Sequence, residues 1–131
     1  MLRRCYACSV APAPLISIVD DDASMREAIG LSLRGYGLRT ATFDSAEAFL
    51  AAVTTLTSAC IIVDVKMPGI SGLELQRRLA RLPGAPPIII VSAHVDDHVE
   101  KRALRAGALA VLSKPFTEET LLDTVRLALE G

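Results

Sequence analysis

Short, mostly apolar runs alternate with longer amphipathic runs along this chain, and this alternation limits its fold more than any other feature. Apolar runs of this length are typical of strands in a parallel sheet, and amphipathic runs are typical of the helices that cover both of its faces. The predicted strands are residues 15–20, 38–42, 59–64, 88–92 and 109–113. Right-handed crossovers then favour an α/β fold with a doubly wound five-stranded parallel sheet in the strand order 2-1-3-4-5.

The amphipathic runs carry apolar residues at helical spacing, as Met25, Ile29 and Leu33 do in the first of them. Asp44 and Glu47 have the spacing of a capping box at the start of the second helix. The five helices are expected over 24–34, from about 44 onward, from 73 to 82, over 96–106, and from 117 onward.

The length of 131 residues suits one domain with a full core. Residues 1–14 contain prolines and precede the first strand, so we expect a disordered tail there and a folded domain over 15–131. Two arginines ahead of an apolar stretch are reminiscent of a signal peptide, but prolines interrupt the stretch and no run reaches the roughly 18 apolar residues of a membrane span. We therefore expect a cytoplasmic protein that does not enter a membrane.

The composition argues against a nucleic-acid-binding surface. Charged residues make up 22% of the chain with a net charge of −1, only 4% of residues are aromatic, and Trp is absent. Such a chain has neither a strongly basic surface nor the usual aromatic platforms for bases. We expect this chain to make no direct contact with nucleic acid.

The three cysteines do not suggest a disulfide framework, because their number is odd and Cys60 lies within a predicted strand. Cys5 and Cys8 form a C-x-x-C pair, compatible with a redox pair or half of a zinc site. His94 and His98 have the spacing of a helical metal pair. The two pairs belong to opposite edges of the predicted sheet, so incidental thiols in a disordered tail are favoured over a joint zinc site.

Polar groups gather where the predicted strands end. The first strand runs into three consecutive carboxylates beginning with Asp20, and the third ends on Asp64. In the order 2-1-3-4-5 the ligand crevice lies between these strands, so Asp20, Asp21 and Asp64 should converge, with Ser92 and Lys114 beside them. Gathered carboxylates repel one another unless a divalent cation or a cationic side chain is present.

This set of groups predicts a magnesium and phosphoryl site. Mg²⁺ is usually held by one or two carboxylates together with water and phosphate oxygens. Lys114 supplies a point charge for a phosphoryl oxygen, and the Ser92 hydroxyl supplies one neutral hydrogen bond. A carboxylate can itself be the nucleophile and form an acyl phosphate, if the metal and Lys114 offset the charge that builds up.

At these residues the sequence resembles the receiver domain of two-component response regulators, over about residues 15 to 130. The matching segments are 19–22, 25–26, Asp64 with 67–69 and 71–72, 91–93, 106–108 and 114–116. Together, in order and at strand ends, they are highly specific. The three aspartates, residues 45–50 and residues 114–116 look closest to the nitrogen-fixation-type regulators. The resemblance implies the flavodoxin-like receiver fold and a signalling domain rather than an enzyme, catalysing only its own phosphotransfer and dephosphorylation.

The resemblance also implies a role for each site residue. Asp64 would accept a phosphoryl group from a histidine kinase or phosphotransfer protein. Asp21, Asp64 and the backbone carbonyl of Lys66 would bind Mg²⁺ or Mn²⁺, with Asp20 acting partly through water. Lys114 would contact the phosphoryl group, and Ser92 would move toward it.

The same resemblance implies how the domain would pass on its signal. The movement of the hydroxyl would switch a surface made by the fourth helix, the fifth strand and the fifth helix. The target would be a downstream protein or an effector domain C-terminal to the receiver, and phosphorylation could also form a homodimer.

Some positions depart from the family pattern. The residue three before Lys114 is usually aromatic, but here it is Val111, so an aromatic toggle is not expected. Lys66 and His94 stand at variable positions near the phosphoryl group. We hypothesise that they tune hydrolysis of the acyl phosphate by crowding or orienting the attacking water.

Two other interpretations of the function compete with that of a phosphoacceptor. A metal-dependent phosphohydrolase also uses a nucleophilic Asp at a strand end, but it needs a second acid two residues later, where this chain has Lys66. A receiver that acts only as a phosphorylation-independent interaction module is favoured by Val111 alone. The complete set of site residues favours the phosphoacceptor.

Overall fold

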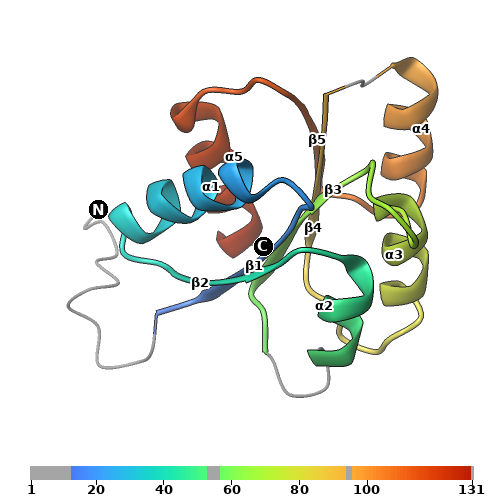
Figure 1. Ribbon diagram of the computed structural model, residues 1–131, viewed down its shortest axis with the longest axis horizontal. Coiled ribbons are helices and arrows are strands. Elements are labelled where there is room, and N and C mark those ends of the chain that lie inside the picture. The colour runs from blue at the N-terminus through green and yellow to red at the C-terminus, as the bar shows by residue number, and fades with distance from the viewer. Residues whose placement is uncertain (1–12, 53–56, 94–95, 131) are drawn as a thin grey trace.

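Strands and helices alternate along the chain in the computed structural model, which describes residues 13–52, 57–93 and 96–130 (Figure 1). The strands are β1 (Leu15–Val19), β2 (Arg39–Phe43), β3 (Cys60–Asp64), β4 (Ile88–Ser92) and β5 (Ala110–Ser113). The helices are α1 (Ala23–Gly35), α2 (Ala46–Ala52), α3 (Gly72–Leu79), α4 (Asp97–Arg105) and α5 (Glu118–Glu130). Residues 1–12 lie outside the described residues, as does His94, so the disordered tail and the roles of Cys5 and Cys8 stay predictions.

The five strands form one parallel sheet in the order β2-β1-β3-β4-β5, which confirms the predicted fold class. The order reverses between β1 and β3, where the chain leaves the sheet in opposite directions. Val19 is paired with Val63 in this register, so the residues that follow them reach the same edge of the sheet together.

The sheet separates two hydrophobic clusters, because successive side chains of a strand point to opposite faces. In β3, Cys60 and Ile62 join the cluster beneath α1 and α5, and Ile61 and Val63 join the cluster beneath α2, α3 and α4 (Figure 1). Every residue of β3 is buried, as expected for a central strand. Burial raises the pKa of the Cys60 thiol to about 12, so this cysteine packs as a neutral apolar residue.

Each of the five helices in the described part of the chain begins at a side chain that accepts a hydrogen bond from a backbone N–H of the first turn. The caps are Asp22, Ser45, Ser71, Asp96 and Thr117. The capping box predicted from Asp44 and Glu47 is wrong: the Ser45 hydroxyl accepts the Ala48 N–H at 3.0 Å, and Glu47 reaches another loop. Leu82, predicted within the third helix, lies beyond its end and is exposed.

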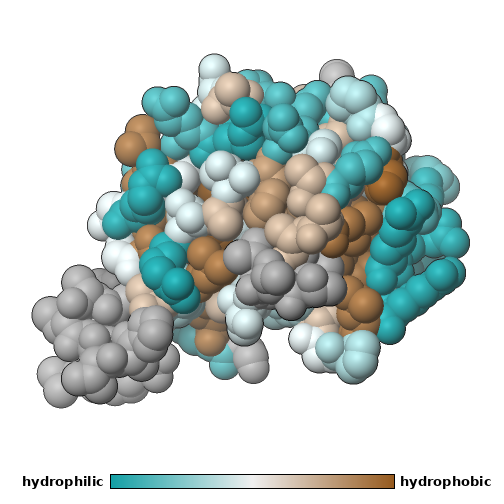
Figure 2. Space-filling model, turned by 60° about the horizontal axis from the view of Figure 1, so that its bottom comes forward, coloured by the Kyte–Doolittle hydropathy of each residue, from teal (hydrophilic) through white to brown (hydrophobic). Residues whose placement is uncertain are grey.

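The surface carries both hydrophilic and hydrophobic areas. The edge formed by α3 and α4 is mostly hydrophilic in Figure 2, and hydrophobic residues appear elsewhere as separate patches. On the exposed face of α3, Glu74 forms ion pairs with Arg77 and Arg78 at 3.2 and 3.1 Å. None of the described helices is long and apolar enough to cross a bilayer.

Gln76 joins α3 to the end of α4. Its side chain is buried, and its Nε2 donates a hydrogen bond of 2.8 Å to the carbonyl oxygen of Ala103. The same oxygen accepts the Ala108 N–H at 3.0 Å, in the pattern that ends a helix at a left-handed glycine such as Gly107. The Oε1 atom of Gln76 is buried without a hydrogen-bond partner among the described residues.

Gln76→Glu should destabilise the fold by about 2–4 kcal/mol at neutral pH, because a buried carboxylate oxygen would face the Ala103 carbonyl. Gln76→Met loses the hydrogen bond but also removes the unpaired oxygen, so its cost should stay below about 1 kcal/mol. Urea unfolding followed by circular dichroism measures both values. Equal losses in the two variants would contradict this arrangement of the amide.

Candidate functional site

Asp20 is the most buried carboxylate at the edge where β1 and β3 end, with 1% of its surface exposed. Its Oδ1 accepts the Asp22 N–H at 2.9 Å, and its Oδ2 accepts the Lys114 ammonium at 2.9 Å. Its backbone N–H donates to the Phe43 carbonyl at 3.1 Å, and its own carbonyl accepts Arg26 Nη1 at 2.7 Å. Asp20 is therefore fixed through both its backbone and its side chain.

Asp21 and Asp64 complete an acidic cluster with Asp20. One carboxylate oxygen from each of the three residues lies within 4.8 Å of the others. Asp64 is the last residue of β3 and is buried, whereas Asp21 is exposed to solvent. The structure thus brings together the three carboxylates that the strand-end pattern placed at one edge.

Lys114 supplies the cation of this cluster. Its Nζ lies 2.9 Å from Asp20 Oδ2 and 3.2 Å from Asp64 Oδ1. The residue follows β5, its backbone N–H donates to the Ser92 carbonyl at 2.8 Å, and its peptide bond to Pro115 is cis. The side chain of one residue therefore joins the ends of β1 and β3 to the end of β5.

The charges of the cluster are unbalanced, because three carboxylates face one ammonium group. Burial raises the pKa of the Asp64 carboxyl, and the Asp20 charge raises it further, although Lys114 partly opposes both effects. Burial alone would lower the pKa of Lys114, but its hydrogen bond to Asp20 and the charges of both carboxylates raise it on balance. Lys114 therefore stays charged at neutral pH, and the site retains an excess of negative charge.

Ser92 ends β4 and is buried. In the register of β3 and β4 it stands one residue beyond Val91, the partner of Asp64. Val111 lies in β5 opposite Ile90 and packs against the cluster beneath α2, α3 and α4. The structure therefore places Ser92 at the edge beside Asp64 and Val111 within the sheet.

The loop between β3 and α3, residues 65–71, is anchored close to Asp64. The Val65 N–H donates to the Val91 carbonyl at 3.0 Å, and the Gly72 N–H donates to the Val65 carbonyl at 2.9 Å. A Cβ atom at Gly72 would lie 2.2 Å from the Asp64 carbonyl oxygen, so only glycine fits there. The base of this loop is held directly against the backbone of Asp64.

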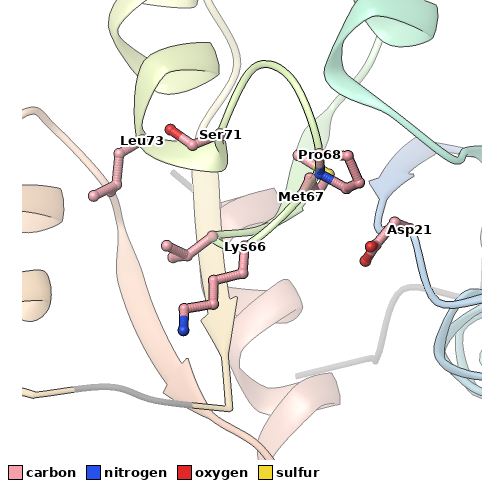
Figure 3. Close-up of a pocket in the computed structure, with 7 residues that line it drawn as sticks. Asp21, Lys66, Met67, Pro68, Ser71 and Leu73 are labelled. Atoms are coloured by element: carbon pink, nitrogen blue, oxygen red, sulfur yellow. The ribbon is translucent and has the colours of Figure 1, made fainter.

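A shallow pocket of about 520 Å³ opens beside the cluster (Figure 3). Asp21 enters it from the end of β1, and the other labelled residues belong to the β3–α3 loop and the start of α3. Lys66 is exposed, and its side chain projects from the loop. A long cationic side chain thus stands at the rim of the acidic site.

The site suits a hard divalent cation. Carboxylate and carbonyl oxygens are the ligands that Mg²⁺ prefers, and the excess negative charge favours its binding. Both oxygens of Asp20 already accept hydrogen bonds, so Asp21 and Asp64 have more capacity for a metal ion. A nucleophilic carboxylate beside a cation can also form an acyl phosphate.

Comparison with known proteins identifies the family. A model of the response regulator receiver domain matches residues 16–126. The chain belongs to the response regulator receiver family. Response regulator protein TmoT of Ectopseudomonas mendocina is 47% identical over 116 residues, which are 88% of this chain and 53% of that protein. A crystal structure of a response regulator receiver protein from Burkholderia phymatum has a TM-score of 0.80 and 42% identity, covering 89% of this chain and 95% of the other.

A transcriptional regulatory protein is also among the relatives of this receiver domain. Transcriptional regulatory protein FixJ of Bradyrhizobium diazoefficiens is 36% identical over 114 residues, 87% of this chain and 56% of that protein. The chain spans about half the length of these curated relatives.

Arg26 is a residue of this receiver site for which the sequence alone indicated no role. It lies in the first turn of α1, where its backbone N–H donates to the Asp22 carbonyl at 3.0 Å and its guanidinium donates back to the Asp20 carbonyl. A cation one helical turn after a run of strand-end carboxylates is the signal that points to such a contact. Arg26 therefore fixes the backbone from which Asp20 and Asp21 project.

Asp64→Asn should raise the free energy of unfolding of the receiver domain at pH 7 by on the order of 1 kcal/mol. The raised pKa means that folding favours the protonated carboxyl. The stability from this preference is present below the unfolded-state pKa near 3.8 and is lost as pH rises through the folded-state pKa. Asn stays neutral and avoids that loss.

Urea unfolding without divalent cations, repeated as the pH is lowered from 7 toward 4, measures this difference. The advantage of the Asn variant should shrink at lower pH, where Asp64 also becomes neutral. An advantage that grows on acidification would contradict the direction of the pKa shift.

Proposed function

We propose that this receiver domain is the phosphoacceptor of a two-component phosphorelay and that Asp64 takes the phosphoryl group. The position of Asp64 carries the proposal: its carboxylate ends the central strand, belongs to the acidic cluster and lies 3.2 Å from the Lys114 ammonium. A carboxylate so placed combines a nucleophilic oxygen with a cation that offsets the charge built up during transfer.

The donor would be a phosphohistidine of a histidine kinase or phosphotransfer protein. An Asp64 oxygen attacks phosphorus, the bond between phosphorus and the imidazole nitrogen breaks, and the nitrogen keeps the electron pair and takes up a proton. Later attack by water on phosphorus releases inorganic phosphate and restores the carboxylate. In this scheme the chain is not an enzyme for an external substrate, because it catalyses only its own phosphotransfer and dephosphorylation.

Mg²⁺, or Mn²⁺ in its place, would be held by Asp21, Asp64 and the backbone carbonyl of Lys66. The ion would neutralise oxygens of the carboxylate and of the phosphoryl group. Asp20 would act partly through water, since its own oxygens already accept hydrogen bonds from Asp22 and Lys114. Lys114 would contact the phosphoryl group after transfer.

Ser92 would move toward the phosphoryl group and switch the surface formed by α4, β5 and α5. The burial of Ser92 at the end of β4 supports this role, because a small displacement there acts on the chain that leads into α4. Val111 is too small to report the switch as an aromatic ring would, so the response would pass through α4.

The output would be a protein interaction. The relatives named response regulator protein TmoT and transcriptional regulatory protein FixJ extend well beyond the part that matches this chain, which supports an effector part under receiver control. A separate downstream protein or a phosphorylation-dependent homodimer would use the same surface. The domain would work in the cytoplasm and would not itself contact nucleic acid or membrane.

Incubation with Mg²⁺ and acetyl phosphate should add one phosphoryl group to the chain, as measured by intact mass. The gain should disappear when Mg²⁺ is chelated and in Asp64→Asn, because both the metal and the nucleophile are required. The absence of a gain under conditions where Mg²⁺ demonstrably binds would instead favour the phosphorylation-independent interaction module.

Lys66→Ala should shorten the lifetime of the phosphoryl group by about 2- to 10-fold, because removing this long side chain from the rim of the site opens it to water. His94→Ala tests the second predicted modulator, which should also change the lifetime. Loss of the added mass over time, after removal of the donor, gives the rate of hydrolysis. Lifetimes unchanged in both variants would rule out a tuning role for these residues.

A further inference from the structure

We infer that Glu47 is a positioning residue for the metal-binding loop between β3 and α3. Glu47 lies in the first turn of α2, outside the acidic cluster. Its Oε2 accepts the backbone N–H of Ile70 at 3.2 Å, across 23 positions of the chain. A carboxylate of α2 therefore bonds directly to the loop that carries Lys66. This inference rests on the proposed function, because it assigns Glu47 to the same metal site.

Gly69, the residue before Ile70, leaves room for the same carboxylate. Its φ of +78° is a left-handed conformation that favours glycine. A Cβ atom at this position would lie 2.4 Å from Glu47 Oε2 and 3.3 Å from its Cδ. The Glu47 carboxylate therefore occupies the space that the missing side chain leaves open. The hydrogen bond to Ile70 holds the carboxylate, and the absence of a side chain at Gly69 leaves the space that it occupies.

The base and the apex of the β3–α3 loop are held by different contacts. Its base is held by the backbone hydrogen bonds of Val65 and Gly72 and by the packing of Gly72 on Asp64. Its apex, Pro68 and Gly69, is exposed, and Glu47 bonds to the residue that follows it. Lys66 lies between the fixed base and this apex. Met67, between Lys66 and the apex, is buried in the cluster beneath α2, α3 and α4, so Glu47 acts on the backbone at Lys66 from beyond this buried side chain.

The role of Glu47 differs from a simple charge effect. A carboxylate in the first turn of a helix also interacts favourably with the helix dipole, and any carboxylate near the site adds negative potential. Both effects depend on charge and would be lost in a glutamine variant. The contact with Ile70 requires only an acceptor oxygen, which the Gln side chain retains. Glutamine rescue therefore separates positioning from charge.

Isothermal titration of Mg²⁺ into the protein, without phosphodonor, tests the inference. Glu47→Ala should weaken Mg²⁺ binding by about 3- to 10-fold, the range expected for loss of one hydrogen bond that orders the loop. Glu47→Gln should bind within about 2-fold of the parent. Glu119→Ala, which removes an exposed carboxylate from the first turn of α5, is the matched control and should also bind like the parent.

Three outcomes of this titration would overturn the inference. If Glu47→Ala binds Mg²⁺ like the parent, the loop does not need the contact. If Glu47→Gln loses as much affinity as Glu47→Ala, charge and not positioning is responsible. If the parent itself does not bind Mg²⁺, the proposed function fails and the metal role of Glu47 fails with it.

A mutant cycle tests the contact without any metal. The φ strain of Gly69→Ala is the same with or without Glu47, but the clash with the carboxylate exists only when Glu47 is present. Gly69→Ala should therefore shift the urea midpoint less in the Glu47→Ala background than in the parent. Equal shifts in the two backgrounds would show that the contact of Glu47 with the loop contributes nothing to stability, whatever the result with Mg²⁺.

Discussion

The contacts of the Lys114 ammonium with two carboxylates hold this site together. They join the end of β5 to the ends of β1 and β3, at 2.9 Å from Asp20 and 3.2 Å from Asp64. Loss of Lys114 would leave the buried carboxylate of Asp20 without its cation, at a typical cost of about 3–5 kcal/mol, so the arrangement of three strand ends depends on this side chain. One ammonium cannot balance three carboxylates, and the raised pKa of Asp64 reflects its burial and then the remaining repulsion from Asp20. The domain therefore folds with a site whose electrostatics still favour an added cation.

The sheet and the acidic cluster could be predicted because both follow from short-range patterns. Residues 60–64 are apolar until their last position, and all of them are buried in the central strand. Once the crossover rule gives the strand order, the residues after β1 and β3 must meet. The cap of α2 could not be predicted in this way. Asp44 and Ser45 are both good caps, and the choice depends on where β2 ends; the strand continues to Phe43, and Ser45 is the residue that caps.

The contacts that the sequence did not predict were hard to predict for one physical reason. Arg26, Glu47 and Gln76 each donate to or accept from a backbone group, and two of them act across more than 20 positions of the chain. Periodicity indicates which face of a helix is apolar, but it does not indicate which backbone atom a polar side chain will meet. Gly69, which is left-handed in the structure, could have pointed to the contact with Glu47, because a glycine in a turn leaves space for a neighbouring group.

These contacts hold the surroundings of the acidic cluster more closely than they hold α4. Arg26 fixes the backbone before α1, Gly72 packs on Asp64, and the helices and loops around the acidic cluster are therefore tied to the central strands. In contrast, Ala103 is the buried residue of α4, and Gln76 holds that helix near its C-terminal end. If Ser92 responds to a phosphoryl group as proposed, the N-terminal end of α4 can move while its C-terminal end stays in place. A helix with a wide apolar face could not do so, because movement would expose area worth about 25 cal/mol per Å².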